Sequence, residues 1–199
     1  MSYFYKYIDL PAIPEELLTN LEQYYSNTLN VYRATLDFDP DTVKFDYKPE
    51  TVGELDPKTF YNFELTESPL RTWVEQNIAT DACQYGVTVF GAYANNNRPF
   101  HIDYSRDYVL MYVHDLGGDN VVTSFYKSAS RPLMLDNDAY STFEDEELTL
   151  LDSVHVEQGR WMYLNVKVIH QVSQLTGIRR SVQLGFNYDK YQLNTPTTL

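Results

Sequence analysis

The chain has 199 residues with 28 acidic and 15 basic side chains, which gives a formal net charge of -13 at pH 7. Its length favours a single domain, and its negative charge disfavours binding to the phosphates of nucleic acids. Because 43% of the residues are hydrophobic and 15% are aromatic, the composition excludes a largely disordered chain.

The single cysteine and the distribution of apolar residues favour a reducing, non-membrane compartment. Cys83 is the only cysteine, so the chain forms no intramolecular disulfide. No run approaches the ~18 apolar residues that span a bilayer, and residues 1–6 lack the basic and then apolar pattern of a secretory signal. We therefore expect a cytoplasmic protein with no membrane partner.

Two helices are predicted in the N-terminal part of the chain. Helical spacing of apolar residues predicts the first over 14–26, from Leu17, Leu18, Leu21, Tyr24 and Tyr25. The second is predicted from Ser68, as N-cap, and Pro69, at the first helical position, to about Asn77. Between them, residues 31–60 alternate aromatic runs with Asp, Pro and Gly, which predicts irregular strands and turns.

From Gly86 onward, β-branched and aromatic runs alternate with turn signals. The spacing of these turns, roughly 8 to 12 residues, is typical of an antiparallel sandwich or jelly roll. We therefore predict a mainly β fold with flanking helices in one domain, 1–199. Its parts are a helical and irregular N-terminal support at 1–84, a core at 85–190 that is an antiparallel sandwich or jelly roll, and an extended tail at 191–199.

Two histidine–carboxylate pairs have the H-x-[D/E] spacing that places both side chains on one face of a strand. They are His101 with Asp103 and His155 with Glu157. Chance alone gives on the order of half a match in a chain of this composition, so the spacing is weak by itself. We favour the first pair because suitable residues follow it, whereas no comparable strand is expected before the second.

His170 is the residue that joins the first pair. It follows an apolar strand predicted at 161–168, in which Trp161 and Tyr163 are expected to be core residues. Together with His101 and Asp103 it supplies two imidazoles and one carboxylate. This ligand set is typical of non-haem Fe(II) oxygenases and leaves three coordination positions open.

The strand after the turn at 176–177 carries a candidate anion-binding pair. Arg179 and Ser181 share one face of this strand, where they suit a carboxylate of a bound acid. Arg180 points to the other face. A register slip of one residue exchanges the two arginines, so the alternation alone leaves Arg179 and Arg180 open.

This arrangement resembles the Fe(II)- and 2-oxoglutarate-dependent dioxygenases, especially their compact prolyl-hydroxylase-like branch. The resemblance lies in VTVFGAY (87–93), PFHID (99–103), GRW (159–161), HQV (170–172) and GIRRS (177–181). It implies that the core at 85–190 is a double-stranded β-helix (jelly roll, cupin-like). It also implies three Fe(II) ligands: His101, Asp103 and His170. It also implies that Arg179 with Ser181 binds the distal carboxylate of 2-oxoglutarate, to which Tyr93 corresponds as a further contact. The Asn-rich turn after Tyr93 departs from the family pattern.

The resemblance implies hydroxylation of a protein side chain or small molecule, with O2 and 2-oxoglutarate consumed and succinate and CO2 released. Because Asp103 fills the position that halogenating relatives leave open for chloride, halogenation is not expected. Compact members of the family occur in bacteria and bacteriophages, which agrees with a cytosolic protein. The loops at 31–60 and 128–147 are candidate lids.

Three matters stay open at this point. The substrate and the oligomeric state do not follow from these residues. A non-catalytic jelly-roll binding or assembly protein is an alternative, although such a scaffold has no need of a charged cluster inside a barrel. A cupin-like metal enzyme without 2-oxoglutarate is a weaker alternative. His114 and His155 are expected at the surface.

Overall fold

The structure is a computed structural model, and it describes residues 2–19, 25–32, 60–65, 67–90, 100–103, 106–135, 143 and 147–196. Over these ranges the chain is mostly antiparallel β-sheet, which confirms the predicted mainly β fold. The elements in chain order are β1 (Tyr5–Ile8), α1 (Glu15–Leu18), β2 (Tyr25–Tyr32), β3 (Phe60–Leu65), α2 (Pro69–Asn77), β4 (Gln84–Phe90), β5 (Tyr108–Leu116), β6 (Val122–Ser128), β7 (Leu148–His155), β8 (Trp161–Asn165), β9 (Ile169–Ser173) and β10 (Arg179–Phe186).

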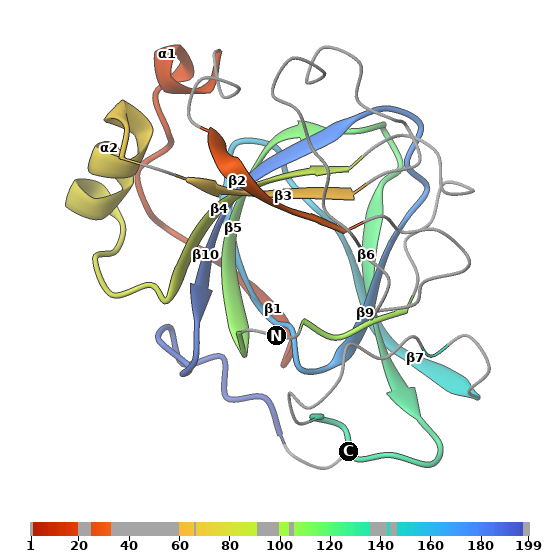
Figure 1. Cartoon of the computed structure of the whole chain (residues 1–199). Helices are drawn as coiled ribbons and strands as arrows, with labels where there is room; N and C mark the ends of the chain where they lie inside the picture. Colours follow the sequence, from red (N-terminus) through yellow and green to blue (C-terminus); the bar gives the residue numbers. More distant parts are fainter. Residues whose placement is uncertain are drawn as a thin grey trace.

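Two sheets face each other across an apolar core (Figure 1). The larger has the strand order β1-β8-β5-β10-β4-β3-β2, and the smaller has the order β7-β6-β9. Alternate residues of β5 point to opposite faces of the larger sheet, as the pleat requires. Met111 belongs to the core between the sheets, together with Phe125 of β6, whereas Leu110 and Tyr112 face the other way.

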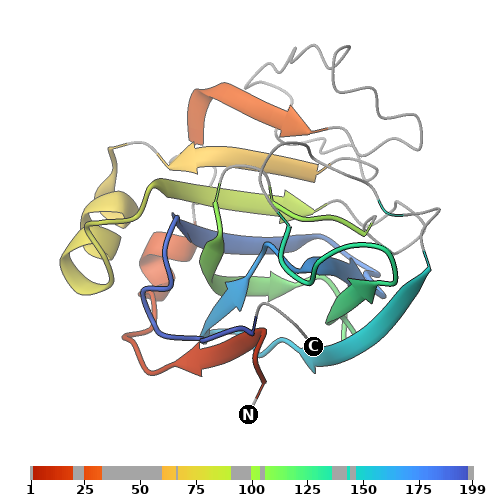
Figure 2. The same cartoon turned by 90° about the horizontal axis from the view of Figure 1, so that it is seen from below.

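Both helices cover the outer face of the larger sheet, away from the smaller one (Figures 1 and 2). Leu18 of α1 and Leu70 and Val74 of α2 pack there in one cluster with Leu110 and Tyr112. The N-terminus of α2 is as predicted, since the Ser68 Oγ accepts a hydrogen bond from the backbone N–H of Arg71 at 3.1 Å. Both helices therefore leave uncovered the inner face of the larger sheet, which faces the smaller sheet.

The first predicted helix, 14–26, is wrong at Tyr25 and Ser26, and 20–24 lie outside the described residues. Helix α1 ends at Leu18, and the Thr19 hydroxyl donates to the Glu15 carbonyl at 2.9 Å. Tyr25 and Ser26, expected in the helix, begin β2, which pairs with β3. An aromatic residue such as Tyr25 suits a strand as well as a helix, and the pairing with β3 decides between them.

The N-terminal part also differs from the helical and irregular support that the sequence predicted. Strands β1, β2 and β3 extend the larger sheet at both edges, so the sheet is not confined to 85–190. Residues 191–196 lie against the N-terminal segment, where Lys6 donates to the Tyr191 carbonyl and Leu193 is buried. The Thr195 hydroxyl also donates to the Tyr3 carbonyl, so this part of the predicted tail packs against the N-terminal segment. Neither helix in the described part of the chain has the length and apolar character needed to span a bilayer.

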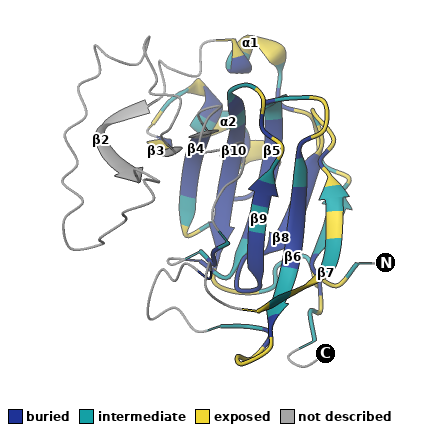
Figure 3. Cartoon of the chain, turned by 90° about the vertical axis from the view of Figure 1, so that its right-hand side faces the viewer, coloured by how far each residue is buried: buried dark blue, intermediate teal, exposed yellow. Residues whose placement is uncertain are grey.

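The strand predicted at 161–168 ends earlier than expected, and residues 166–168 connect it to a strand of the other sheet. Strand β8 ends at Asn165 in the larger sheet, and β9 begins at Ile169 in the smaller one. The connecting residues Val166 and Val168 are buried between the sheets. Their burial explains why apolar residues continue past the end of β8. Figure 3 shows that β8 and β10 are almost entirely buried.

Candidate metal centre

His101 and His170 form a backbone bridge at the edge of the smaller sheet. The His101 N–H donates to the His170 carbonyl at 3.0 Å, and the His170 N–H donates to the His101 carbonyl at 2.9 Å. A reciprocal antiparallel pair of this kind places both side chains on the same face. The two imidazole rings accordingly lie 4.3 Å apart between centroids, and both residues are buried.

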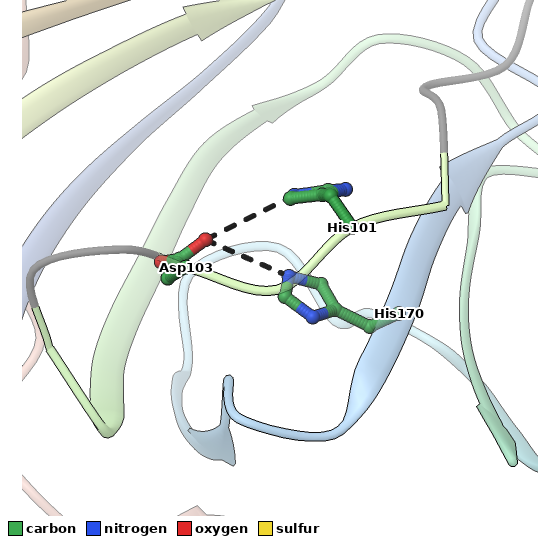
Figure 4. A group of neighbouring side chains, drawn as sticks. All are labelled: His101, Asp103 and His170. Carbon is green, nitrogen blue, oxygen red and sulfur yellow. Dashed lines mark ion pairs between the residues drawn. The ribbon is translucent and has the colours of Figure 1, made fainter. Parts of the chain in front are cut away.

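Asp103 completes the cluster from the segment that follows His101. Its N–H donates to the Val166 carbonyl at 2.9 Å, which fixes the backbone beside the connection from β8 to β9. Its Oδ1 lies 3.9 Å from Nε2 of His101 and 3.8 Å from Nε2 of His170 (Figure 4). Two atoms that each lie about 2.1 Å from one ion are at most about 4.2 Å apart, so both separations are within reach of one metal ion.

The orientation of His170 leaves its Nε2 available to a metal. Its Nδ1 lies 3.0 Å from the carbonyl oxygen of Val168, which is an acceptor only. This carbonyl therefore requires the hydrogen on Nδ1, which makes Nε2 the ring nitrogen that can bind a metal. A histidine metal ligand commonly has such a partner on its other nitrogen. Among the described residues, His101, Asp103 and His170 are the group whose ligand atoms lie within 4.8 Å of one another.

The charge on Asp103 is favoured by its surroundings. Burial raises the pKa of its carboxyl, but the guanidinium of Arg106 and the imidazoles of His170 and His101 outweigh this effect and hold the pKa below its ordinary value. The Arg106 Nε donates to Oδ2 of Asp103 at 2.7 Å. The carboxylate therefore stays charged at neutral pH, as a metal ligand must.

The inner face of β10 carries the predicted anion-binding pair. Arg179 and Ser181 are both fully buried, whereas Arg180 lies on the other side and pairs with Asp115 at 2.9 Å. The prediction that Arg179 and Arg180 point to opposite faces of the strand is thus confirmed. Burial lowers the pKa of Arg179 to about 10.

A turn packed against the start of β10 sets the position of Arg179. The Gly117 carbonyl accepts hydrogen bonds at 2.8 Å from the backbone N–H groups of both Thr176 and Gly177. Gly117 has a φ of +76°, and a Cβ there would lie 3.0 Å from the Cβ of Arg179. Only glycine suits this combination of positive φ and close approach.

Other predicted residues lie outside the cluster. Trp161 and Tyr163 are core residues, as predicted. His155 is exposed and His114 is partly buried. The expectation that no strand precedes His155 is wrong, because His155 is the last residue of β7. Tyr93 lies outside the described residues, as do most of 31–60 and part of 128–147, the two candidate lids.

Arg106 and Gln183 are the residues that the sequence analysis missed. The spacing of Arg106, three residues after Asp103, was a usable signal, because short i,i+3 spacings allow a carboxylate and an arginine to meet. Gln183 continues the alternation of Arg179 and Ser181 along the inner face of β10, so a period of two residues would have found it.

Comparisons with known proteins give little further information. No family model and no curated protein sequence matches this chain. Among solved structures it is similar to the X-ray structure of E. coli ycfD, at 10% sequence identity and a TM-score of 0.45. The match covers 90% of this chain and 54% of the other, so this chain spans about half the length of that protein.

Proposed function

We propose that this protein is a non-haem Fe(II)- and 2-oxoglutarate-dependent oxygenase that hydroxylates a protein side chain or a small molecule. The observation that carries the proposal is the convergence of His101, Asp103 and His170 at one point inside the sandwich. These are the residues for which the sequence resemblance implies iron binding. Arg179 and Ser181, implied to bind 2-oxoglutarate, face the same interior.

We also assign the core to the double-stranded β-helix, or jelly roll. The support is the alternation of consecutive segments between the two sheets. Strand β4 lies in the larger sheet, the His101 bridge adjoins the smaller, β5 lies in the larger, and β6 and β7 lie in the smaller. Strands β8, β9 and β10 then lie in the larger, the smaller and the larger sheet.

The three candidate ligands fit Fe(II) by their chemistry. Two imidazoles and one carboxylate leave further coordination positions open to a cosubstrate and O2. When bound, iron together with 2-oxoglutarate and O2 supplies the oxidising chemistry, with succinate and CO2 as coproducts. The protein's part is to hold these groups in place and to exclude bulk water. The Asp103 carboxylate also occupies the position that a halogenase leaves to chloride.

Arg179 is the residue that we assign to the distal carboxylate of 2-oxoglutarate. It is buried and it faces the interior, whereas Arg180 is occupied by the partly exposed Asp115. A planar guanidinium binds a carboxylate through two parallel hydrogen bonds and so fixes its orientation. The hydroxyl of Ser181 lies on the same face and is the second candidate contact.

The net charge of -13 bears on the substrate. Such a chain repels a phosphate backbone, so a nucleic-acid substrate is disfavoured. A protein side chain or a small molecule fits the charge better.

Anaerobic titration with Fe(II), followed by 2-oxoglutarate, tests the proposal. We expect the weak visible charge-transfer band of the iron–2-oxoglutarate chelate in the wild type. The band should be absent in His170→Ala and should need much more 2-oxoglutarate in Arg179→Ala, while Arg180→Ala should behave as the wild type. A wild type without the band at any concentration would overturn the proposal and favour a non-catalytic binding protein.

A further inference from the structure

Arg106 contacts the candidate metal ligand Asp103 in a specific way. Its Nε donates to Oδ2 at 2.7 Å, whereas the other carboxylate oxygen, Oδ1, is the one that faces the imidazole nitrogens of His101 and His170. The two oxygens of one carboxylate therefore have different partners. One is held by a guanidinium, and the other is directed at the site where a metal ion would be bound.

Gln183 holds a second nitrogen of the same guanidinium. The Arg106 Nη2 donates to Oε1 of Gln183 at 2.8 Å, and the Gln183 Nε2 donates to Oγ of Ser181 at 3.2 Å. Arg106 and Gln183 are both buried. A continuous hydrogen-bonded chain thus runs from Asp103 through Arg106 and Gln183 to Ser181.

The backbone of β10 leaves room for this arrangement at Gly185. A Cβ at this position would lie 2.9 Å from Cδ of Arg106 and 3.4 Å from its Cβ. The stem of Arg106 therefore occupies the space that a side chain would take at Gly185. With Gln183 at one end and Gly185 beside the stem, the guanidinium has one well-defined position.

We infer that Arg106 is a positioning residue that makes Asp103 a one-oxygen metal ligand through Oδ1, with Gln183 fixing the guanidinium. This inference rests on the proposed metal site. The bond to Oδ2 prevents the carboxylate from rotating to present both oxygens, so the remaining coordination positions stay open for cosubstrate and O2. Hydrogen-bond partners of metal ligands commonly contribute 10- to 100-fold to metal affinity, which is roughly the effect expected here.

Lysine cannot replace arginine in this role. An ammonium group is a point donor on a flexible stem, whereas the guanidinium is a planar fork that reaches Asp103 and Gln183 at the same time. Arg106→Lys therefore keeps the positive charge but loses the simultaneous hydrogen bonds to Asp103 and Gln183. A purely electrostatic role would survive this change, but a positioning role would not.

Binding of Co(II), followed by its visible absorption, tests the inference without relying on turnover. We expect Arg106→Lys to weaken Co(II) binding by roughly 10- to 100-fold. We also expect a changed spectrum, because a carboxylate that binds through both oxygens raises the coordination number. Gln183→Met, which leaves the Asp103–Arg106 bond in place, should weaken binding less. Thermal unfolding of each metal-free variant establishes that it is folded.

Arg160→Lys is the matched control. Arg160 pairs with Glu157 at 2.7 Å with the same i,i+3 spacing, but both side chains are about half exposed. Its Co(II) affinity and spectrum should equal those of the wild type. If Arg106→Lys and Gln183→Met also equal the wild type, the inference is overturned and the proposed function is untouched. If Arg106→Lys fails to fold, an unchanged Gln183→Met alone overturns it. If the wild type binds no Co(II), the inference and the proposed function are both overturned.

Discussion

His101 and His170 are joined through their backbones, independently of any metal. The reciprocal hydrogen bonds of 3.0 and 2.9 Å place two imidazoles side by side from segments far apart in the sequence. Because the side chains take no part in these bonds, the bridge should persist when either imidazole is removed. The candidate site is therefore assembled by folding and does not depend on metal for its formation.

The first prediction follows from this bridge. His101→Ala and His170→Ala should each weaken Co(II) or Fe(II) binding by more than about 100-fold. This loss is larger than the loss expected on replacing Arg106, which only contacts a metal ligand. The metal-free variants should keep the far-ultraviolet circular dichroism of the wild type. His155→Ala, in the second H-x-[D/E] pair, is the control and should bind metal normally. Normal binding by His170→Ala would contradict the assignment of ligands.

The second prediction concerns Arg179. Removing a hydrogen-bonding cation that faces a carboxylate costs about 1.5–3 kcal/mol, so Arg179→Met should weaken 2-oxoglutarate binding to the metal-loaded protein by roughly 10- to 100-fold. Isothermal titration calorimetry measures this change. Arg180→Met, which removes a guanidinium paired with Asp115, should leave the affinity unchanged. The reverse result would assign the cosubstrate to Arg180.

The third prediction uses Gly117 to move Arg179 indirectly. A Cβ at Gly117 would lie 2.9 Å from the Gly177 carbonyl and 3.0 Å from the Arg179 Cβ, and its φ is +76°. Gly159 has a similar φ of +75°, but its nearest neighbour would lie 3.6 Å away. Gly159→Ala should therefore cost about 1–2 kcal/mol of backbone strain in chemical denaturation. Gly117→Ala should cost more and should also weaken 2-oxoglutarate binding, which Gly159→Ala should not.

The fourth prediction concerns Phe143, a described residue of the candidate lid at 128–147. It is fully buried and packs against Ile102 and Ile169, the neighbours of the two histidines. Phe143→Ala should lower the free energy of unfolding by about 3–5 kcal/mol, as measured by urea denaturation. Leu150→Ala, at an exposed position of β7, should change it by less than about 0.5 kcal/mol. Equal effects would show that Phe143 does not anchor the loop.

The fifth prediction concerns acid. The pKa of Asp103 is below its ordinary value in the folded protein, so its charge stabilises the fold above the unfolded pKa, and this contribution is lost as the pH falls through the folded value. Between about pH 5 and pH 2 the free energy of unfolding of the metal-free wild type should therefore fall more steeply than that of Asp103→Asn. Urea denaturation at several pH values measures both slopes. Parallel slopes would mean that Arg106 and the imidazoles do not stabilise the charge.

The sequence by itself determined the features that depend on local pattern. Ser68 and Pro69 specify the start of α2, because an N-cap acts within one turn of its own helix. The alternation of Arg179, Arg180 and Ser181 specified that the two arginines lie on opposite faces, because a strand has a period of two residues. The structure decided that Arg179 is the buried one.

Only the tertiary structure decided the features that depend on a distant partner. Tyr25 enters β2 because β3 offers a strand to pair with, and the apolar run before His170 divides because two different sheets bury its two parts. Gly117 matters because another turn packs against it, and Arg106 matters because Gln183 lies beside it. Such contacts join residues far apart in the chain, so a local sequence pattern cannot predict them. They form because they lower the free energy of the whole folded structure.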